Sequence, residues 1–132
     1  MTLLVPAETV LEADERGIPV STGSVDRTPF DFRAPRRIGN LALDHCFTDL
    51  VRDDDGRARV HLGTGTTLWA DESFGYLMVF TGDGLPDVAR RSLAVEPMTC
   101  APNAFRNGDG LIRLEPAETH TAVWGITPPQ RI

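Results

Sequence analysis

The chain has 132 residues, of which 41% are hydrophobic and 24% charged, so it is long enough to bury a core. Its net charge of −6 disfavours nucleic acid and anionic membrane surfaces as partners, because a phosphate backbone is bound by a basic surface. No apolar stretch approaches the roughly 20 residues that span a bilayer, and no basic residue precedes the short apolar run Leu3–Val5. We therefore expect no membrane span, no signal peptide and a cytoplasmic protein.

Short apolar runs follow one another along the chain, separated by 12 glycines and 10 prolines. None of these runs carries the repeat of an amphipathic helix, and several alternate as strands do. The pattern predicts an all-β protein without internal repeats or a dividing linker. The expected strands are Thr9–Ala13, Ala42–Val51, Ala58–Leu62, Thr66–Asp71, Tyr76–Thr81, Ser92–Pro97, Leu111–Leu114 and Thr119–Ile126.

Residues Glu15–Asn40 differ from the rest because they are rich in glycine, proline and charge. We expect an irregular segment, of the kind that is functional or packs against another element. Arg33, Arg36 and Arg37 form a local basic cluster in it, which we interpret as a solvated loop, with anion binding as the alternative. Further along, Asp53–Gly56 predicts a turn between two strands, because aspartate and glycine suit turn dihedral angles.

The two cysteines, Cys46 and Cys100, are far apart and have no clustered Cys or His partners. This spacing does not indicate a metal site. We interpret both as free buried thiols, the usual state of unpaired cysteine. A disulfide between them is the alternative.

Asp44 and His45 are polar residues inside an apolar run and would be costly to bury without partners. Strand alternation places them on opposite faces of a sheet, so they should not act as a dyad. Either one faces solvent while the other makes a hydrogen bond in the core, or one of them has a functional role.

Glu96 lies at the end of an apolar strand, directly before Pro97. Alternation should place it on the face opposite to Val95. A carboxylate held there beside rigid backbone could act as a general base toward a substrate hydroxyl. The competing interpretation is a structural carboxylate paired with Arg90 or Arg91.

Trp69 and Trp124 could stack on a ligand, although such side chains are more often buried, and we expect Trp124 in the core. His61 and His120 lie in predicted strands without a partner at metal-ligand spacing, and we expect both to be exposed. These four positions stay outside the candidate site.

Segments in five places keep the order and spacing of one known family over nearly the whole chain: Ile18–Val20, Thr28–Arg33, Leu43–Phe47, Val95–Phe105 and Trp124–Ile126. The first two are similar to the passage P-x-G … G-T-P-x-D-F-R, although Arg27 stands where glycine is usual. The third is similar to D-H-x-F, and the fourth contains V-E-P and P-N-A-F. Together they resemble the C-terminal half of the aldose 1-epimerase, or galactose mutarotase, family.

The resemblance implies a galactose mutarotase-like β-sandwich, with residues 1–132 as one β domain corresponding to half of the larger family sandwich. It implies interconversion of the α and β anomers of a hexose such as galactose or glucose, without a metal or organic cofactor. By the match, Glu96 corresponds to the catalytic base that takes the proton of the C1 hydroxyl. Asp44 corresponds to a substrate-binding aspartate that hydrogen-bonds sugar hydroxyls.

The family's histidine that protonates the ring oxygen lies in the N-terminal half, upstream of the matched segments. We therefore expect an incomplete active site in this chain. The interpretations are an isomerase completed by other polypeptide, a non-catalytic or degenerate carbohydrate-binding module, and a purely structural β domain that leaves the ordered motifs unexplained. A half sandwich would also expose strand edges, which predicts a homo-oligomer or an N-terminal-half partner chain.

Overall fold

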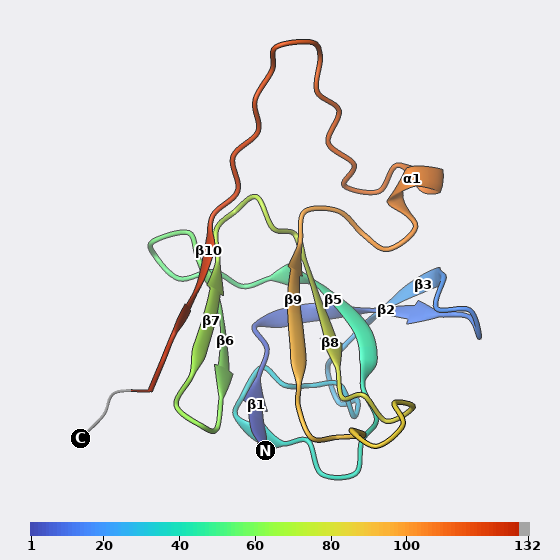
Figure 1. Ribbon diagram of the computed structural model, residues 1–132, viewed down its shortest axis with the longest axis vertical. Helices are drawn as coiled ribbons and strands as arrows, with labels where there is room; N and C mark the ends of the chain where they lie inside the picture. The colour runs from blue at the N-terminus through green and yellow to red at the C-terminus, as the bar shows by residue number, and fades with distance from the viewer. Residues whose placement is uncertain (130–132) are drawn as a thin grey trace.

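The computed structural model describes residues 1–129, which form strands and one short helix arranged as two sheets (Figure 1). Every pair of neighbouring strands is antiparallel. No helix in this part of the chain is long and apolar enough to cross a membrane. The elements are β1 (Thr2–Leu4), β2 (Ala7–Ala13), β3 (Pro19–Ser24), β4 (Arg36–Arg37), β5 (Asp44–Leu50), β6 (Ala58–Leu62), β7 (Thr67–Ala70), β8 (Tyr76–Phe80), β9 (Ala94–Met98), α1 (Ala104–Asn107) and β10 (Trp124–Thr127).

The first sheet has the strand order β10-β7-β6-β1-β4, and the second has the order β3-β2-β5-β8-β9. Figure 1 shows the first sheet on the left and the second on the right, with β9 toward the viewer. Two antiparallel sheets that share a core form a β-sandwich. The prediction of an all-β fold is confirmed.

A hydrophobic core contains buried residues from both sheets. Alternate residues of each strand contribute, as expected where one strand face is buried. Leu3 and Val60 come from the first sheet and Phe47, Leu77 and Val79 from the second, and each is at most 1% exposed. This core fixes which face of the second sheet points inward and, by alternation, which residues point away.

The outer face of the second sheet carries a smaller apolar cluster formed by Leu11, Cys46 and Ala101. Met78 and Met98 pack against it from β8 and β9. Ala101 belongs to the segment after β9, so that segment folds back over the sheet. It covers one part of the outer face and leaves the rest open.

Six predicted strands are present, as β2 and β5 to β9, with boundaries that differ by a few residues at most. Three strands were not predicted, and two of them, β3 and β4, lie in the segment expected to be irregular. Both are edge strands with largely exposed side chains. They gain backbone pairing without burying a face, so they leave little alternating apolar pattern.

The predicted strand Leu111–Leu114 is wrong, and only the last part of Thr119–Ile126 is a strand, as β10. Residues 119–123 alternate in the sequence, yet residues 111–123 are assigned to no strand within the described chain. Alternation needs a neighbouring strand to become a sheet, and local sequence cannot supply that neighbour.

Residues 104–123, called the arm from here on, leave the sandwich after β9 and return at β10 (Figure 1). Near the start of the arm, the Tyr76 hydroxyl donates to Oδ1 of Asp109 at 3.0 Å. At its end, the Asp71 N–H donates to the Val123 carbonyl at 2.9 Å, and the Val123 N–H donates to Oδ2 of Asp71 at 2.7 Å. The arm is therefore an exposed excursion that is tied to the sandwich at both ends.

The basic cluster is balanced by acidic neighbours. Arg33 forms ion pairs of 2.8 Å with each of Glu8, Asp26 and Asp31. Arg36 donates to the Asp31 carbonyl at 3.2 Å. These contacts favour a structural role for the cluster over anion binding.

The turn predicted at Asp53–Gly56 is present, with the Gly56 N–H donating to the Asp53 carbonyl at 2.9 Å. Gly56 has a φ of 79°, which glycine adopts without strain. Arg59 of β6 then binds the carboxylates of Asp53 and Asp55 at 2.5 and 2.6 Å. The acidic side chains of this loop therefore attach the connection between β5 and β6 to Arg59 of β6.

Candidate functional site

Glu96 lies on β9, the outermost strand of the second sheet. Leu93 and Val95 pack against the core, as predicted, and Glu96 is exposed on the opposite face. Pro97 follows it in the strand, where the missing N–H of proline is tolerated because an edge strand has only one neighbour. The Glu96 carboxylate therefore stands on stiff backbone at an open edge.

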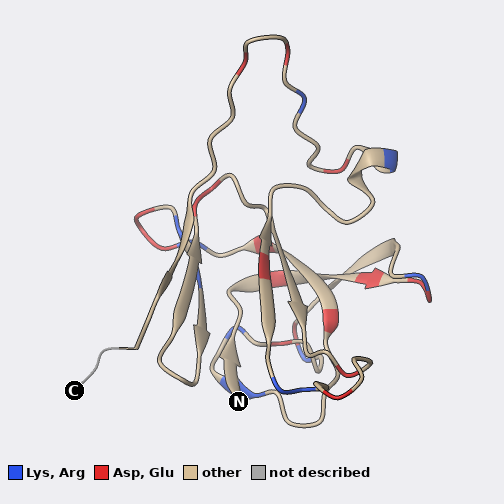
Figure 2. Cartoon of the chain, viewed as in Figure 1, with Lys and Arg blue, Asp and Glu red and all other residues tan. Residues whose placement is uncertain are grey.

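Asp44 lies on the same face of the same sheet, and Figure 2 marks the acidic positions on β5 and β9 in red. Asp44 is the register partner of Phe80, and Glu96 is the register partner of Met78, the neighbouring same-face position on β8. Strands about 4.8 Å apart with a rise of about 3.4 Å per residue separate the two Cα atoms by roughly 12 Å. The two carboxylates therefore face the same space from either side of β8.

Asp44 lines two hollows, one on this face and one at the edge of the sheet where β5 begins and β8 ends. One is about 40 Å³ and lies beside the smaller apolar cluster, with Leu11, Cys46, Met78 and Pro102 in its wall. The other is about 450 Å³ and more open, with His45, Phe80, Asp83 and Leu85 in its wall. Glu96 lines neither of them. Asp44 is shared by both hollows.

The alternative in which Arg90 or Arg91 pairs with the Glu96 carboxylate is wrong. Arg90 donates instead to Oδ1 of Asp83 at 2.6 Å and to the carbonyls of Gly39 and Leu41 at 2.6 and 3.2 Å. Among residues 1–129, no arginine or histidine nitrogen lies within 4.0 Å of the Glu96 carboxylate. Within this part of the chain, the Glu96 carboxylate therefore forms no ion pair.

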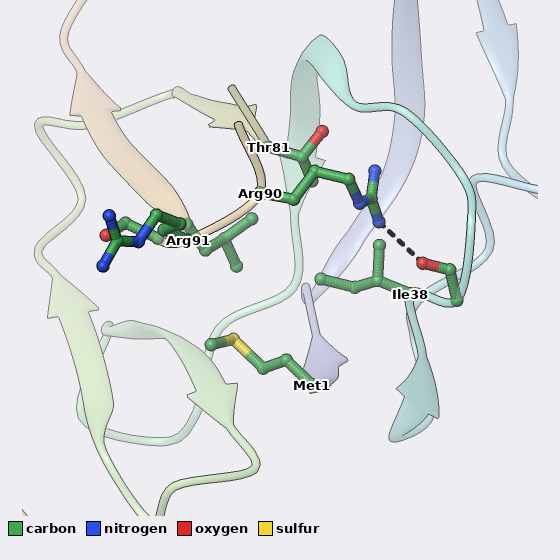
Figure 3. A pocket seen from close by; sticks show the side chains of 8 residues that line it. Met1, Ile38, Thr81, Arg90 and Arg91 are labelled. Atoms are coloured by element: carbon green, nitrogen blue, oxygen red, sulfur yellow. Dashed lines mark hydrogen bonds between the residues drawn. The ribbon is translucent and has the colours of Figure 1, made fainter. Parts of the chain in front are cut away.

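Arg90 and Arg91 line a different pocket, of about 90 Å³ (Figure 3). The Arg90 guanidinium reaches across it to the Gly39 carbonyl, which Figure 3 shows as a dashed line. Leu93, which also lines this pocket, packs against the core and so points away from the Glu96 face. We assign Arg90 a structural role, because it ties the connection between β8 and β9 to the segment before β5.

His45 points to the side opposite Asp44, as predicted. Its ring packs against Phe30 with the ring centroids 4.3 Å apart, and its Nδ1 accepts a hydrogen bond from the Asp44 N–H at 3.0 Å. Burial holds the pKa of His45 below its ordinary value, and the Asp44 carboxylate opposes this only in part. Neutral His45 therefore steadies the backbone that carries Asp44 and does not form a dyad with it.

Both cysteines are free thiols, as predicted. Cys46 is buried, and this burial, with a smaller effect of Asp109, raises its pKa to about 12. Cys100 is only half-buried, which corrects the expectation that both are buried. Across residues 1–129, no group of three or more His, Cys, Asp or Glu side chains is arranged to hold a metal ion.

The two tryptophans lie in the first sheet, Trp69 on β7 and Trp124 on β10. The expectation of a buried Trp124 is wrong, because β10 is an outer strand and the side chain is 52% exposed. Phe80 is an aromatic residue beside the candidate site that the sequence did not single out. It lies on β8, where its register partners are Asp44 of β5 and Ala94 of β9. Its strand was predicted, but the pairing order that brings Phe80 beside the carboxylates was not.

The structure is an antiparallel β-sandwich with two exposed carboxylates, Asp44 and Glu96, on one open face of its second sheet. The model of one family, aldose 1-epimerase, matches residues 2–127. The chain belongs to that family, which confirms the resemblance seen in the sequence.

Individual proteins that are similar to this chain were also found. The uncharacterised protein YihR of Escherichia coli K12 is 31% identical over 125 residues, which are 92% of this chain and 38% of YihR. The crystal structure of the GalM/aldose epimerase homologue of Caenorhabditis elegans matches with a TM-score of 0.75 at 20% identity, covering 98% of this chain and 46% of that one. A candidate aldose 1-epimerase of Escherichia coli K12 matches with a TM-score of 0.67 at 16% identity, covering 96% and 45%. These structures establish a galactose mutarotase-like sandwich, and the chain spans less than half the length of each of these relatives.

Proposed function

We propose that this chain forms part of an aldose 1-epimerase that interconverts the anomers of a hexose such as galactose or glucose. Glu96 is the general base, and Asp44 is a contact to the sugar hydroxyls. The observation that carries the proposal is the position of Asp44 and Glu96 on one open sheet face, on either side of β8, in a member of this family. Neither carboxylate pairs with a basic side chain among the residues described.

In this reaction Glu96 takes the proton of the C1 hydroxyl while the bond between C1 and the ring oxygen breaks. A general acid gives a proton to the ring oxygen, so the sugar opens to an aldehyde. Rotation about the C1–C2 bond and reclosure reverse both proton transfers and give the other anomer. Asp44 accepts hydrogen bonds from hydroxyls that do not react, which holds the rest of the sugar still during the rotation. The scheme uses no metal or organic cofactor.

The general acid is the part that this chain does not place beside Glu96. Of its three histidines, His45 points to the core side of the second sheet, and His61 lies in the first sheet, where it contacts the Thr67 hydroxyl at 2.9 Å. His120 lies on the exposed arm. We therefore propose that polypeptide beyond these residues supplies the acid, as an N-terminal half or through association of chains. The two free thiols are compatible with a reducing, cytoplasmic setting.

The second candidate is a non-catalytic carbohydrate-binding module. It is favoured by the same placement of the histidines, together with the two hollows at Asp44. In that case Asp44 would still bind sugar, and Glu96 would be a further contact without a proton to transfer.

The test is the change in optical rotation of freshly dissolved α-galactose. The isolated chain should be close to background, because losing general acid or base help costs about 10²–10⁴-fold in rate. Adding a polypeptide that spans the unmatched part of YihR should restore mutarotation, and Glu96→Gln should abolish the restored rate. Glu72→Gln, which removes an exposed carboxylate between β7 and β8, is the matched control and should have no effect. A fast reaction that survives Glu96→Gln would refute the assigned base.

Sugar binding separates the two candidates. Saturation-transfer NMR with galactose should detect binding that Asp44→Asn weakens. Binding together with activity that can be restored supports the epimerase. Binding without any restorable activity supports the module.

A further inference from the structure

Thr81 directly follows β8 and is the only buried polar residue among residues 1–129, with 4% of its surface exposed. It holds the backbone of Leu43 at two points. The Thr81 hydroxyl oxygen accepts from the Leu43 N–H at 2.9 Å, and the Thr81 N–H donates to the Leu43 carbonyl at 2.9 Å. Buried backbone groups need partners, and Thr81 supplies both. The residue after Leu43 is Asp44, at which β5 begins.

Asp83 fixes the direction of the Thr81 hydroxyl. A hydroxyl has one hydrogen, and a carboxylate is a stronger acceptor than a carbonyl, so Thr81 donates to Oδ2 of Asp83. Arg90 donates to the other oxygen, Oδ1, at 2.6 Å. These contacts, that of Thr81 first, hold the pKa of Asp83 below its ordinary value. Both oxygens of Asp83 are therefore engaged, although Asp83 lines the same hollow of about 450 Å³ as Asp44.

Arg90 holds the rest of the segment that leads to Asp44. Its guanidinium donates to the carbonyls of Gly39 and Leu41 at 2.6 and 3.2 Å, and its N–H donates to the Thr81 carbonyl at 3.2 Å (Figure 3). Arg90 has a φ of 57°, which residues other than glycine seldom adopt and which persists where surrounding contacts fix it. Three alternate residues before Asp44 are thus each bound by Thr81 or Arg90.

We propose that Thr81 and Arg90 are positioning residues that hold the Asp44 carboxylate at a fixed point beside its hollow. The inference rests on the proposed function, in which Asp44 contacts the sugar hydroxyls. Because β5 begins at Asp44, this side chain stands at a strand end, and strand ends fray unless further contacts hold them. A carboxylate that is held in place before the sugar arrives loses less conformational freedom on binding. Both residues act through the backbone of residues 39–43.

A simpler role for these contacts would be stability alone. Leu43 is also anchored by its own side chain, which is buried in the core. If that anchor were sufficient, the Thr81 hydroxyl would only satisfy buried backbone groups. Its loss would then lower the stability of the fold without a specific effect at Asp44. The two roles therefore differ in where the effect of removing the hydroxyl is found.

The first measurement uses the full 132-residue chain and needs no sugar. Thr81→Val removes the hydroxyl and keeps nearly the same shape, whereas Thr81→Ser keeps the hydroxyl. Loss of one buried hydrogen bond should speed hydrogen exchange at the amides of Leu43 and Asp44 about tenfold in Thr81→Val, with Thr81→Ser close to the parent chain. Thr48→Val is the matched control, because it removes a hydroxyl of β5 that donates to the Gly75 carbonyl at 3.0 Å. It should leave these two amides unchanged.

The second measurement is the affinity for galactose, from a titration followed by NMR. Thr81→Val and Arg90→Met should each weaken binding about fivefold, while Thr81→Ser and Thr48→Val should not. In chains that already carry Asp44→Asn, Thr81→Val should cause no further loss, because the hydroxyl acts on the sugar only through Asp44. This double-variant comparison separates positioning of Asp44 from a general loosening of the fold.

Three outcomes would overturn the proposal. The first is unchanged exchange at Leu43 and Asp44 in Thr81→Val, and the second is faster exchange that extends equally to the amides of β6 in the other sheet. The third is an equal loss of galactose affinity in Thr81→Val with and without Asp44→Asn. Faster exchange confined to Leu43 and Asp44 in a chain that binds no galactose would refute the proposed sugar contact and leave the support of the Asp44 backbone standing.

Discussion

Trp69 of β7 lies so close to its register partner Gly125 of β10 that a methyl group on Gly125 would come within 2.5 Å of the indole ring. The guanidinium of Arg57 also stacks over this ring, 4.2 Å from its centroid. The indole is therefore confined by Gly125 and by Arg57. Of all residues, only glycine leaves enough room at position 125 for the ring.

Replacing Gly125 with alanine should destabilise the protein and loosen β10. The added methyl group must displace the ring of Trp69, and overpacking of this kind costs about 1–3 kcal/mol. Urea unfolding followed by tryptophan fluorescence would measure the loss. Gly75→Ala is the matched control, because a methyl group there meets nothing within 4 Å. Equal stability of the two variants would show that the contact with Trp69 is not restrictive.

The two thiols should differ sharply in reactivity. Cys46 is buried with a pKa raised to about 12, so at pH 8 only about one molecule in ten thousand carries its thiolate, the reactive form. A disulfide-exchange reagent should therefore react quickly with Cys100 alone and reach Cys46 only after unfolding. Cys100→Ser should remove the fast phase, and Cys46→Ser should keep it. Two fast phases of equal size in the parent chain would contradict the burial of Cys46.

The stability of the fold should fall between pH 4 and pH 2 in a way that depends on Arg33. Hydrogen bonding to Arg33 lowers the pKa of Asp31 to about 2. Because this is below the value in the unfolded chain, about 3.9, ionised Asp31 stabilises the fold above pH 4, and this contribution is lost as the pH falls toward 2. Arg33→Met should flatten that dependence in thermal unfolding, whereas Arg113→Met on the arm should not. Identical pH profiles for the parent and Arg33→Met would rule this out.

His45 should make the fold less stable in mild acid. Its pKa in the folded protein is lowered by burial, so below its ordinary value near 6.5 the unfolded chain binds a proton that the folded chain resists. Stability should therefore decrease as the pH falls from 6.5 toward the lowered pKa. The variant His45→Asn puts a side-chain amide, which does not titrate, in the place of the ring nitrogen Nδ1. It should remove this pH dependence in urea unfolding. His120→Asn, at an exposed position, is the control and should keep it. If His45→Asn keeps the same slope, another group is responsible.

The alternation of apolar and polar residues predicted those strands in which one face is buried and the other is exposed. β6 was predicted with its exact bounds, because Ala58 and Val60 are buried and the residues between and after them are not. β3 was missed because its pairing with β2 buries almost none of its side chains. The strand predicted at Thr119–Ile126 rested on alternation, but residues 119–123 have no neighbouring strand in the described chain and are not part of a sheet.

The site was predictable only one strand at a time. Alternation correctly placed Glu96 opposite to Val95 and Asp44 opposite to His45, because the two faces of a strand depend only on local sequence. It could not show that β8 lies between β5 and β9, since strand order depends on pairing between distant segments. The position of Phe80 beside Asp44 follows from that strand order, so the sequence could not predict it. The assigned roles of Asp44 and Glu96 stay predictions.

The peptide bonds at the tip of the arm are not what keeps β10 in the first sheet. The turn at residues 115–118 lies between the anchors at Asp109 and Val123, and neither sheet draws a strand from it. β10 is retained by its pairing with β7 and by Asp71. The tip is therefore a natural place for new chain ends in a circular permutant, or for an inserted reporter domain that leaves Glu96 untouched.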